Sequence, residues 1–243
     1  MPATPASFAE KPCIITEMVK ETPDVVRFRF EPKDGTKMGF EPGMFVMLAY
    51  VDPSTNEKTA RAFSIASAPS QDFLEFYISM VHGKLTSRLE NAKVGDMYRI
   101  TGPYGQFKFV PNADKKVLFL AGGTGLAPFM SMLREIRLLS SGNDVSMLYS
   151  VKYPNEVIRR DELAELGRQM DLKTVITVTR PQPGDGWTGQ TGHIDSEMIK
   201  RYAPDFAERV PYICGPLNFA KAMKDALVSL EVPPERIKAD VWG

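Results

Sequence analysis

The chain has 243 residues, of which 43% are hydrophobic and 25% are charged, and this ordinary globular composition excludes collagen-like, disordered and low-complexity proteins. Its 30 Lys and Arg balance its 30 Asp and Glu, so it lacks the positive excess expected of a protein that tracks nucleic-acid phosphates. Two cysteines and two histidines are too few for an iron–sulfur cluster held by four thiolates or for a typical structural zinc site, so we expect no metal.

The N-terminal segment MPATPASFAE has neither the basic region nor the apolar region of a secretory signal. The longest apolar run near the N-terminus, residues 44–51, is far shorter than a membrane span. We therefore expect a cytoplasmic protein with no membrane span.

Residues 10–101 have the pattern of short strands. Val26, Phe28 and Phe30 alternate with Arg27 and Arg29, and this period of two indicates a half-buried strand. Six expected strands, separated by Pro, Gly and Asp turn signals, span 13–18, 24–30, 44–51, 61–66, 74–80 and 97–101, with one short helix at 85–91. This pattern predicts an antiparallel barrel or sandwich.

The pattern changes after residues 111–114, where apolar strand-like runs begin to alternate with helix-like segments. The expected strands are 117–121, 145–151, 173–179, 210–214 and 237–241, and the helices between them are 127–140, 160–170, 196–202 and 217–230. Alternating strands and helices predict a parallel sheet with helices on both faces. We place the domain boundary near residues 112–115.

A glycine-rich segment, residues 122–125, follows the buried strand 117–121 and precedes a helix. Glycines let the backbone approach a phosphate closely, and a helix N-terminus offers unpaired N–H groups. Pro128 suits the first helical position, where no N–H is needed. A tight strand-to-helix turn without a ligand explains the same residues, and the spacing is not that of the GxGxxG motif.

Three further segments contain candidate binding residues. In RAFS, Arg61 could hold a diphosphate, Phe63 offers a ring face, and Ser64 offers a hydroxyl to a ring nitrogen. Taken alone, this tetrapeptide is better explained by a surface arginine beside a core phenylalanine. In GKLTS, a helix N-terminus and Thr86 form a second candidate anion site, although Thr86 as a simple N-cap explains the same residues. In CGP, Cys214 ends a strand at the sheet edge where ligands of α/β folds bind, although most such thiols are structural.

Together and in order, RAFS, GKLTS, GPYGQF, AGGTGLAPF and YICGP resemble the motifs of the ferredoxin–NADP reductase superfamily of flavoproteins. The resemblance runs from about residue 10 to the C-terminus. It implies a six-stranded antiparallel Greek-key FAD-binding barrel, residues 10–112, followed by a doubly wound parallel-sheet NAD(P)H-binding domain, residues 115–243.

The resemblance also implies the residues that hold the flavin. Arg61 would bind its diphosphate, Ser64 would lie near N5, and Phe63, where the family usually has tyrosine, would stack on the isoalloxazine. The remaining residues implied for this half are Ala62, Tyr77, Ile78 and Ser79, the last three on the adenosine side, and Gly83, Lys84, Leu85 and Thr86 at the diphosphate.

For the nicotinamide nucleotide, the resemblance implies the glycine-rich loop and the end of the CGP strand. Cys214 would lie beside the nicotinamide C4, and Trp242 would be a displaceable lid over the flavin; Ser64, Cys214 and Trp242 are thus the expected catalytic residues. Asp240 is a weaker candidate for a proton or charge partner. The other nucleotide-binding residues implied are Gly122, Gly123, Thr124, Gly125, Pro128, Gly215 and Pro216.

The implied function is an FAD-dependent NAD(P)H oxidoreductase. Hydride would pass from nicotinamide C4 to flavin N5, and electrons would then pass to a separate acceptor, such as a ferredoxin-type protein or oxygenase component. Two alternatives stay open: a reductase of free flavin, and an electron-transfer or regulatory subunit of a larger redox complex. FAD versus FMN is also open. NADH versus NADPH is open as well, because Ser150, Lys152, Tyr153 and Arg180 suit NADPH slightly better, whereas the nearby Glu156 and Asp161 oppose a 2′-phosphate.

Overall fold

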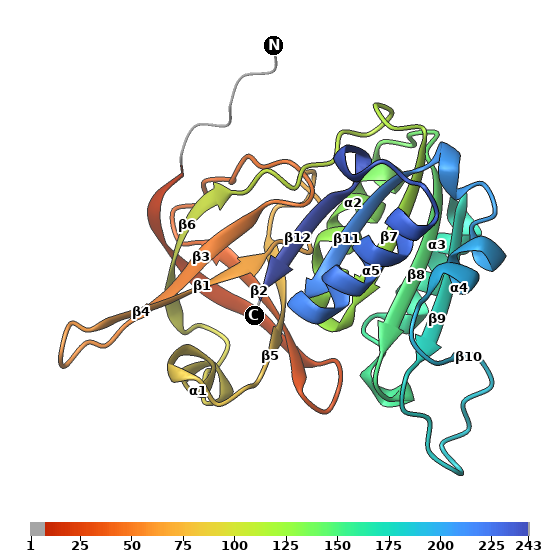
Figure 1. The fold of residues 1–243 in the computed structure, drawn as a ribbon. Coiled ribbons are helices and arrows are strands. Elements are labelled where there is room, and N and C mark those ends of the chain that lie inside the picture. Colours follow the sequence, from red (N-terminus) through yellow and green to blue (C-terminus); the bar gives the residue numbers. More distant parts are fainter. Residues whose placement is uncertain (1–7, 243) are drawn as a thin grey trace. The chain divides into compact units, whose positions relative to one another are not determined.

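The computed structural model describes residues 8–242 of the chain, which divides into two compact units (Figure 1). The first unit contains Met1–Phe109 and Met130–Glu135, and the second contains Val110–Phe129 and Ile136–Gly243. No helix formed by residues 8–242 is both long and apolar enough to cross a membrane.

The first unit is a six-stranded antiparallel sheet whose strand order is β4-β3-β6-β1-β2-β5. The end strands β4 and β5 contact each other, so the sheet closes into the predicted Greek-key barrel. Its elements are β1 (Phe8–Lys20), β2 (Val25–Pro32), β3 (Phe45–Val51), β4 (Lys58–Ser64), β5 (Leu74–Ser79), α1 (Lys84–Glu90) and β6 (Met97–Tyr104).

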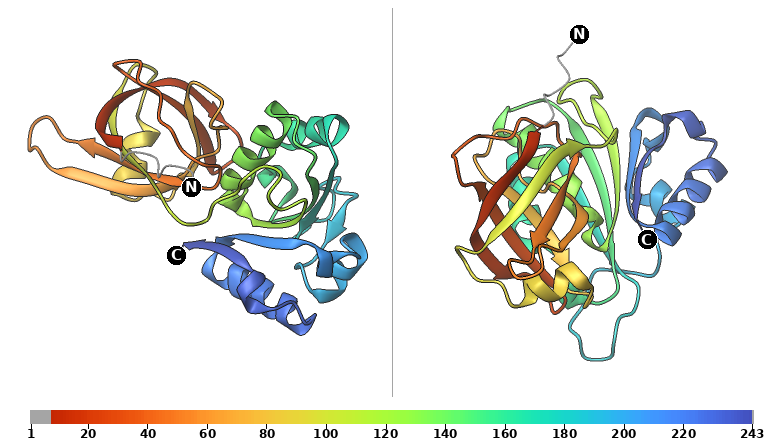
Figure 2. Two further views of the ribbon diagram at one scale, coloured as in Figure 1. Left: turned by 90° about the horizontal axis from the view of Figure 1, so that it is seen from above. Right: turned by 90° about the vertical axis from the view of Figure 1, so that its left-hand side faces the viewer.

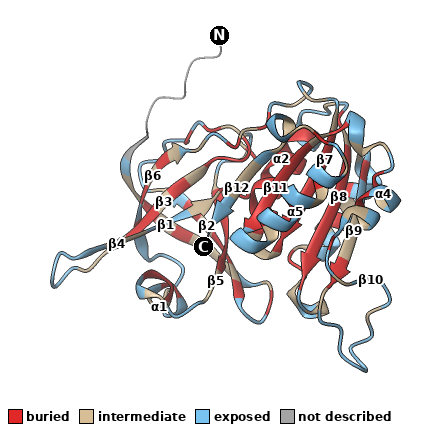
Figure 3. Cartoon of the chain, in the orientation of Figure 1, coloured by how far each residue is buried: buried red, intermediate tan, exposed pale blue. Residues whose placement is uncertain are grey.

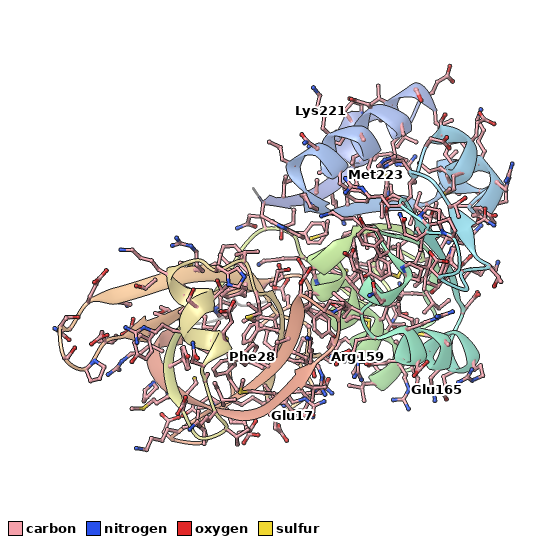
Figure 4. All side chains as sticks on the ribbon, turned by 90° about the horizontal axis from the view of Figure 1, so that it is seen from below. Glu17, Phe28, Arg159, Glu165, Lys221 and Met223 are labelled. Carbon is pink, nitrogen blue, oxygen red and sulfur yellow. The ribbon has the colours of Figure 1, made fainter. Side chains whose placement is uncertain are left out.

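Aromatic side chains on alternate strand positions fill the barrel. Phe28, Phe30 and Phe76 are completely buried, and the Phe30 ring lies 5.8 Å from the rings of both Phe76 and Tyr98. In Figure 4, Phe28 points into this core. The predicted period of two therefore identified the inward face of β2 correctly.

Strand β4 covers residues 58–64, so it begins three residues before the expected segment 61–66 and ends two residues before that segment ends. The Ile65 N–H donates to Met44 O (3.0 Å) and the Ala66 N–H donates to Glu75 O (2.8 Å), so the backbone turns inward after Ser64. The expected strand was wrong at both ends because polar residues open β4, and two buried apolar residues follow it.

The second unit is a six-stranded parallel sheet whose strand order is β10-β9-β8-β7-β11-β12. This confirms the predicted doubly wound parallel sheet; the short strand β10 was missed because two residues show no periodicity. Its strands are β7 (Lys116–Gly122), β8 (Asp144–Val151), β9 (Leu172–Val178), β10 (Gln190–Thr191), β11 (Val210–Pro216) and β12 (Lys238–Trp242), and its helices are α2 (Leu126–Leu138), α3 (Arg160–Gln169), α4 (Ser196–Tyr202) and α5 (Leu217–Ser229).

Helices cover both faces of this parallel sheet (Figure 2, left). On one face, Met223 of α5 packs in a core cluster that includes Leu118 and Ile213, while Lys221 of the same helix points away (Figure 4). On the other face, the Phe119 ring stacks 4.7 Å from the Phe129 ring of α2. The central strands β7, β8 and β11 are consequently almost wholly buried (Figure 3).

Candidate functional site

Strand β4 carries the RAFS segment at one end of the first sheet, where it hydrogen-bonds only to β3. The Arg61 guanidinium is exposed; its Nη1 donates to Ala60 O (2.8 Å), and no carboxylate of residues 8–242 pairs with it. The Phe63 ring packs against the barrel core, 6.5 Å from the Phe76 ring, and Ser64 is half-buried. This strand therefore offers an unpaired cation, part of an aromatic face and a hydroxyl.

The residues expected on the adenosine side lie on or beside β5 and are mostly enclosed by protein. Ile78 is completely buried in the barrel core. The buried Tyr77 hydroxyl donates to Glu75 Oε1 (3.1 Å) and accepts from Arg134 Nη2 (3.3 Å). Of the three expected residues, only Ser79 has a partly exposed side chain, so β5 can meet a ligand mainly through its backbone.

Glu75 of β5 lies in a buried ionic cluster that the sequence did not predict. Glu75 is completely buried, and its carboxylate accepts from Arg134 Nη1 (2.7 Å), Arg29 Nε (2.9 Å) and Arg27 Nη1 (3.2 Å). Arg134 lies in the α2 segment that belongs to the first unit. Burial alone would raise the pKa of Glu75, but Arg134 and the other two guanidinium groups lower it from 4.5 to about 2, so the carboxylate is ionised.

Helix α1 begins at the GKLTS segment with Gly83 as its N-cap. Thr86 is the third helical residue, so the interpretation of Thr86 as the N-cap was wrong; its Oγ1 accepts from the Gly83 N–H (2.8 Å) and donates to Gly83 O (3.2 Å). Leu85 is buried in the barrel core, and the Lys84 ammonium faces Glu57 Oε1 at 3.3 Å. A ligand at this position would therefore meet the first-turn N–H groups, which have no partner within a helix.

In the second unit, the glycine-rich loop is a single 3₁₀ turn, Gly123–Gly125, between β7 and α2. Helix α2 begins at Leu126, so Pro128 is its third residue, and the prediction that Pro128 opens the helix was wrong. The position still lies in the first turn, where a missing N–H removes no intrahelical hydrogen bond.

Close packing explains three glycines at the end of the sheet. A Cβ on Gly125 would lie 2.2 Å from Cys214 O, and one on Gly122 or Gly215 would lie 2.9 Å or 2.7 Å from the Phe219 ring. Gly123 differs, because it has a φ of +55° and its missing Cβ would meet nothing within 4 Å. The loop thus packs tightly against the end of β11 and leaves open space at Gly123.

Cys214 is completely buried and lies beside Ala121 of β7 and Asp240 of β12 in the parallel ladders. Its Sγ is 4.0 Å from Asp240 Oδ2, the distance of a weak S–H donor. Burial, and then the Asp240 carboxylate, raise the pKa of Cys214 well above its usual value, so it stays a thiol at neutral pH. Burial also raises the pKa of Asp240.

The last residues of β11 and β12 form an apolar edge beside Cys214. Trp242 pairs with the exposed Pro216 in the ladder and is 36% exposed, and the neighbouring Leu217 is 57% exposed. The parallel sheet therefore brings the glycine loop, the CGP segment and Trp242 to the carboxyl ends of β7, β11 and β12.

A second group of side chains lies at the carboxyl ends of β8 and β9. The Arg180 N–H donates to Lys152 O (2.8 Å), and the Lys152 N–H donates to Glu156 Oε2 (3.1 Å). The side chains of Lys152 and Arg180 are exposed, and that of Glu156 is half-buried. This edge of the sheet thus presents two cations and one carboxylate.

These donor sets suit the anionic dinucleotides that the resemblance implies. The first unit offers an exposed guanidinium at Arg61 and first-turn amides at α1, and the second offers open space at Gly123 beside the start of α2. Guanidinium and helix N-terminal N–H groups are typical phosphate donors. The residues present therefore fit FAD in the first unit and a nicotinamide nucleotide in the second.

Two family models match the chain, one to each unit. The oxidoreductase FAD-binding domain matches residues 12–109, and the oxidoreductase NAD-binding domain matches residues 119–225.

Among curated proteins, the chain is similar to the stachydrine N-demethylase reductase subunit Stc4 of Rhizobium meliloti, with 32% identity over 86% of the chain and 60% of that protein. It is also similar to the glycine betaine monooxygenase reductase subunit of Pseudomonas aeruginosa, with 31% identity over 93% of the chain and 63% of that protein. The chain thus spans less than two thirds of the length of these relatives.

Among solved structures, the cytochrome b5 reductase domain of Ulva prolifera nitrate reductase has a TM-score of 0.83 and 25% identity, covering 96% of this chain and 97% of that domain. The barrel, the parallel sheet, the two family models and this structural likeness all agree. The chain is a member of the ferredoxin–NADP reductase superfamily, with an FAD-binding domain followed by an NAD-binding domain.

Proposed function

We propose that the protein is an FAD-dependent NAD(P)H oxidoreductase that delivers electrons to a separate acceptor. One observation carries the proposal: an FAD-binding and an NAD-binding domain share one chain. Its similarity to relatives named as reductase subunits of an N-demethylase and a monooxygenase supports the proposal. Bound FAD would accept hydride from the nicotinamide and release the electrons singly.

In the flavin-binding half, residues 10–112, the chain's own groups bind and orient the cofactor. The Arg61 guanidinium neutralises the diphosphate together with amides at the start of α1, and Phe63 offers its free face to the isoalloxazine. The Ser64 hydroxyl hydrogen-bonds near N5. The other residues of this half that contact FAD, chiefly through their backbone, are Ala62, Tyr77, Ile78, Ser79, Gly83, Lys84, Leu85 and Thr86.

In the nucleotide-binding half, residues 115–243, the loop at Gly123 receives the nucleotide because it is the open position of the turn. The Cys214 thiol lies at the nicotinamide and, being protonated, orients the ring without attacking it. Trp242 would serve as a displaceable lid over the flavin ring. The other residues proposed for this half are Gly122, Thr124, Gly125, Pro128, Gly215 and Pro216.

The nucleotide's 2′ position falls at the edge formed by Lys152, Arg180 and Glu156. Two exposed cations favour a 2′-phosphate, whereas the half-buried carboxylate favours a free hydroxyl. The exposed guanidinium of Arg180 can pair with a 2′-phosphate, so we propose that NADPH is accepted through Arg180.

The acceptor is proposed to be a ferredoxin-type protein or an oxygenase component, and the reaction to take place in the cytoplasm. Both similar relatives are named as reductase subunits, which supports a partner protein as the destination of the electrons. The 243 residues contain two cysteines, fewer than the four thiolates of an iron–sulfur cluster, so a cluster that accepts the electrons would be supplied from outside these residues.

Reduction of ferricyanide, a one-electron acceptor used as a probe, tests this function. The purified chain should reduce ferricyanide with NADPH or NADH without added flavin, and it should be yellow. A colourless protein whose activity saturates with added flavin would identify a reductase of free flavin instead. Bound flavin with no ferricyanide reduction would favour a subunit that works only within a complex.

A further inference from the structure

The loop between β3 and β4, residues 52–57, is held by its own hydrogen bonds and presents two carboxylates, Asp52 and Glu57. The Asp52 N–H donates to Glu57 O (3.0 Å), and the Asn56 N–H donates to Asp52 O (2.8 Å). Asp52 Oδ1 accepts from the Ser54 hydroxyl (2.6 Å) and N–H (2.9 Å). These contacts leave Asp52 Oδ2 to face another element.

Two ion pairs join helix α1 to this loop, and the pair formed by Arg88 is shorter than the pair formed by Lys84. Arg88 Nη2 lies 2.8 Å from Asp52 Oδ2, and its guanidinium carbon lies 5.1 Å above the Tyr50 ring of β3. Lys84 Nζ lies 3.3 Å from Glu57 Oε1, but these two side chains are 76% and 63% exposed, so water and salt weaken their attraction. Arg88 is therefore the main polar link between α1 and the β3–β4 hairpin.

The same hairpin carries Arg61, because β4 begins directly after the loop and hydrogen-bonds to no strand except β3. The apolar face of α1, with Leu85 and Leu89, fixes the depth of the helix in the barrel core. Arg88, three residues after Leu85, lies beside this apolar face and contacts the hairpin at Asp52 and Tyr50. It is therefore placed to fix the spacing between the first turn of α1 and β4.

We infer that Arg88 is a positioning residue for FAD: through Asp52 and Tyr50 it sets the distance between Arg61 and the first turn of α1, the two donors to the diphosphate. The inference rests on the proposed function, since it assumes that FAD binds there. Under this inference, the Arg88–Asp52 ion pair contributes to the affinity for FAD as well as to stability.

Titration of the full-length, flavin-free protein with FAD and with riboflavin, followed by flavin fluorescence, tests this inference. Riboflavin has the isoalloxazine but no phosphate. Arg88→Ala should raise the Kd for FAD about 3- to 10-fold, because it removes one ion pair and one cation–π contact. The Kd for riboflavin should change less than about twofold. Arg88→Lys, which keeps the charge beside Asp52, should recover most of the FAD affinity. Lys37→Ala, which breaks the exposed Lys37–Asp72 ion pair elsewhere on the barrel, is the control and should change neither dissociation constant.

If Arg88→Ala weakens the binding of FAD and of riboflavin equally, or does not weaken the binding of FAD, the inference is wrong. If Arg88→Ala does not fold, Asp52→Asn removes the same ion pair and is judged by the same two titrations. A wild-type protein that binds no FAD would instead count against the proposed function, so the two failures are distinguishable.

Discussion

Two connections, from β5 to α1 and from β7 to α2, each lead from a strand through glycine into a helix, but different interactions stabilise them. The first depends on charge and hydrogen bonds: the Glu75 carboxylate of β5 pairs with arginines, and the Gly83 N–H donates to Thr86 Oγ1 at the start of α1. The second depends on steric fit, because Gly122 and Gly125 allow the turn to pack against the end of β11. Similar glycine signals in a sequence can therefore have different physical causes, and the two connections should respond to different perturbations.

The largest effect is expected at Glu75. Glu75→Gln should lower the free energy of unfolding by about 3 kcal/mol at pH 7, because it leaves three arginines around a neutral group. The carboxylate's pKa is lowered from 4.5 to about 2 in the folded state. Its stabilisation is therefore complete above pH 4.5 and is lost as the pH falls toward 2.

Urea unfolding at pH 7 and at pH 3 measures this effect, with the exposed Glu31→Gln as the control. The difference in the free energy of unfolding between wild type and Glu75→Gln should be smaller at pH 3 than at pH 7. An equal difference at both pH values would show that the charge of Glu75 does not stabilise the first unit.

At the second connection, Gly125→Ala should destabilise the protein by about 2 to 3 kcal/mol, because the new Cβ would lie 2.2 Å from the backbone oxygen of Cys214. Gly142→Ala is the matched control, since its Cβ would meet nothing within 4 Å. Thermal unfolding compares the two variants. Equal melting temperatures would contradict the steric account of the loop.

Arg61→Ala should weaken FAD binding about 10- to 100-fold, the loss of charged hydrogen bonds to phosphate, with little change in melting temperature because Arg61 is exposed. Arg99→Ala removes another exposed arginine of the same barrel and should leave FAD affinity unchanged. Flavin fluorescence during titration measures both. FAD affinity unaltered in Arg61→Ala would remove this residue from the site.

Arg180→Ala should raise the KM for NADPH about tenfold and change that for NADH less than about twofold, because only NADPH has the 2′-phosphate. Arg201→Ala, at an exposed position of α4, serves as the control for lost surface charge. Steady-state ferricyanide reduction with each nucleotide gives the constants. An equal rise for both nucleotides would refute the 2′-phosphate role.

The smallest effect is expected for Ser64→Ala, which removes one neutral hydrogen bond. Flavin reduction in stopped-flow measurements should slow about fivefold, while FAD affinity changes less. An unchanged reduction rate would exclude Ser64 from hydride transfer.

The sequence predicted the elements well where a periodic apolar face decided them, as at Phe28 and Phe30. It did not predict that Arg27, on the opposite face, is also buried, because alternation cannot distinguish a polar face in water from one that buries an ionic cluster. It located the glycine loop, but not the reason for Gly122, because the close neighbour Phe219 lies on a helix far along the chain. Contacts distant in sequence leave no local signal.

Anaerobic titration of the purified protein with NADH and then NADPH, followed through the visible spectrum, tests whether the chain holds a flavin that accepts hydride. We expect flavin absorption bands that bleach when nucleotide is added, with NADPH effective at the lower concentration. Absence of flavin bands, even after incubation with FAD or FMN, would contradict this expectation and would show that Arg61, Ser64 and the start of α1 do not form a flavin site.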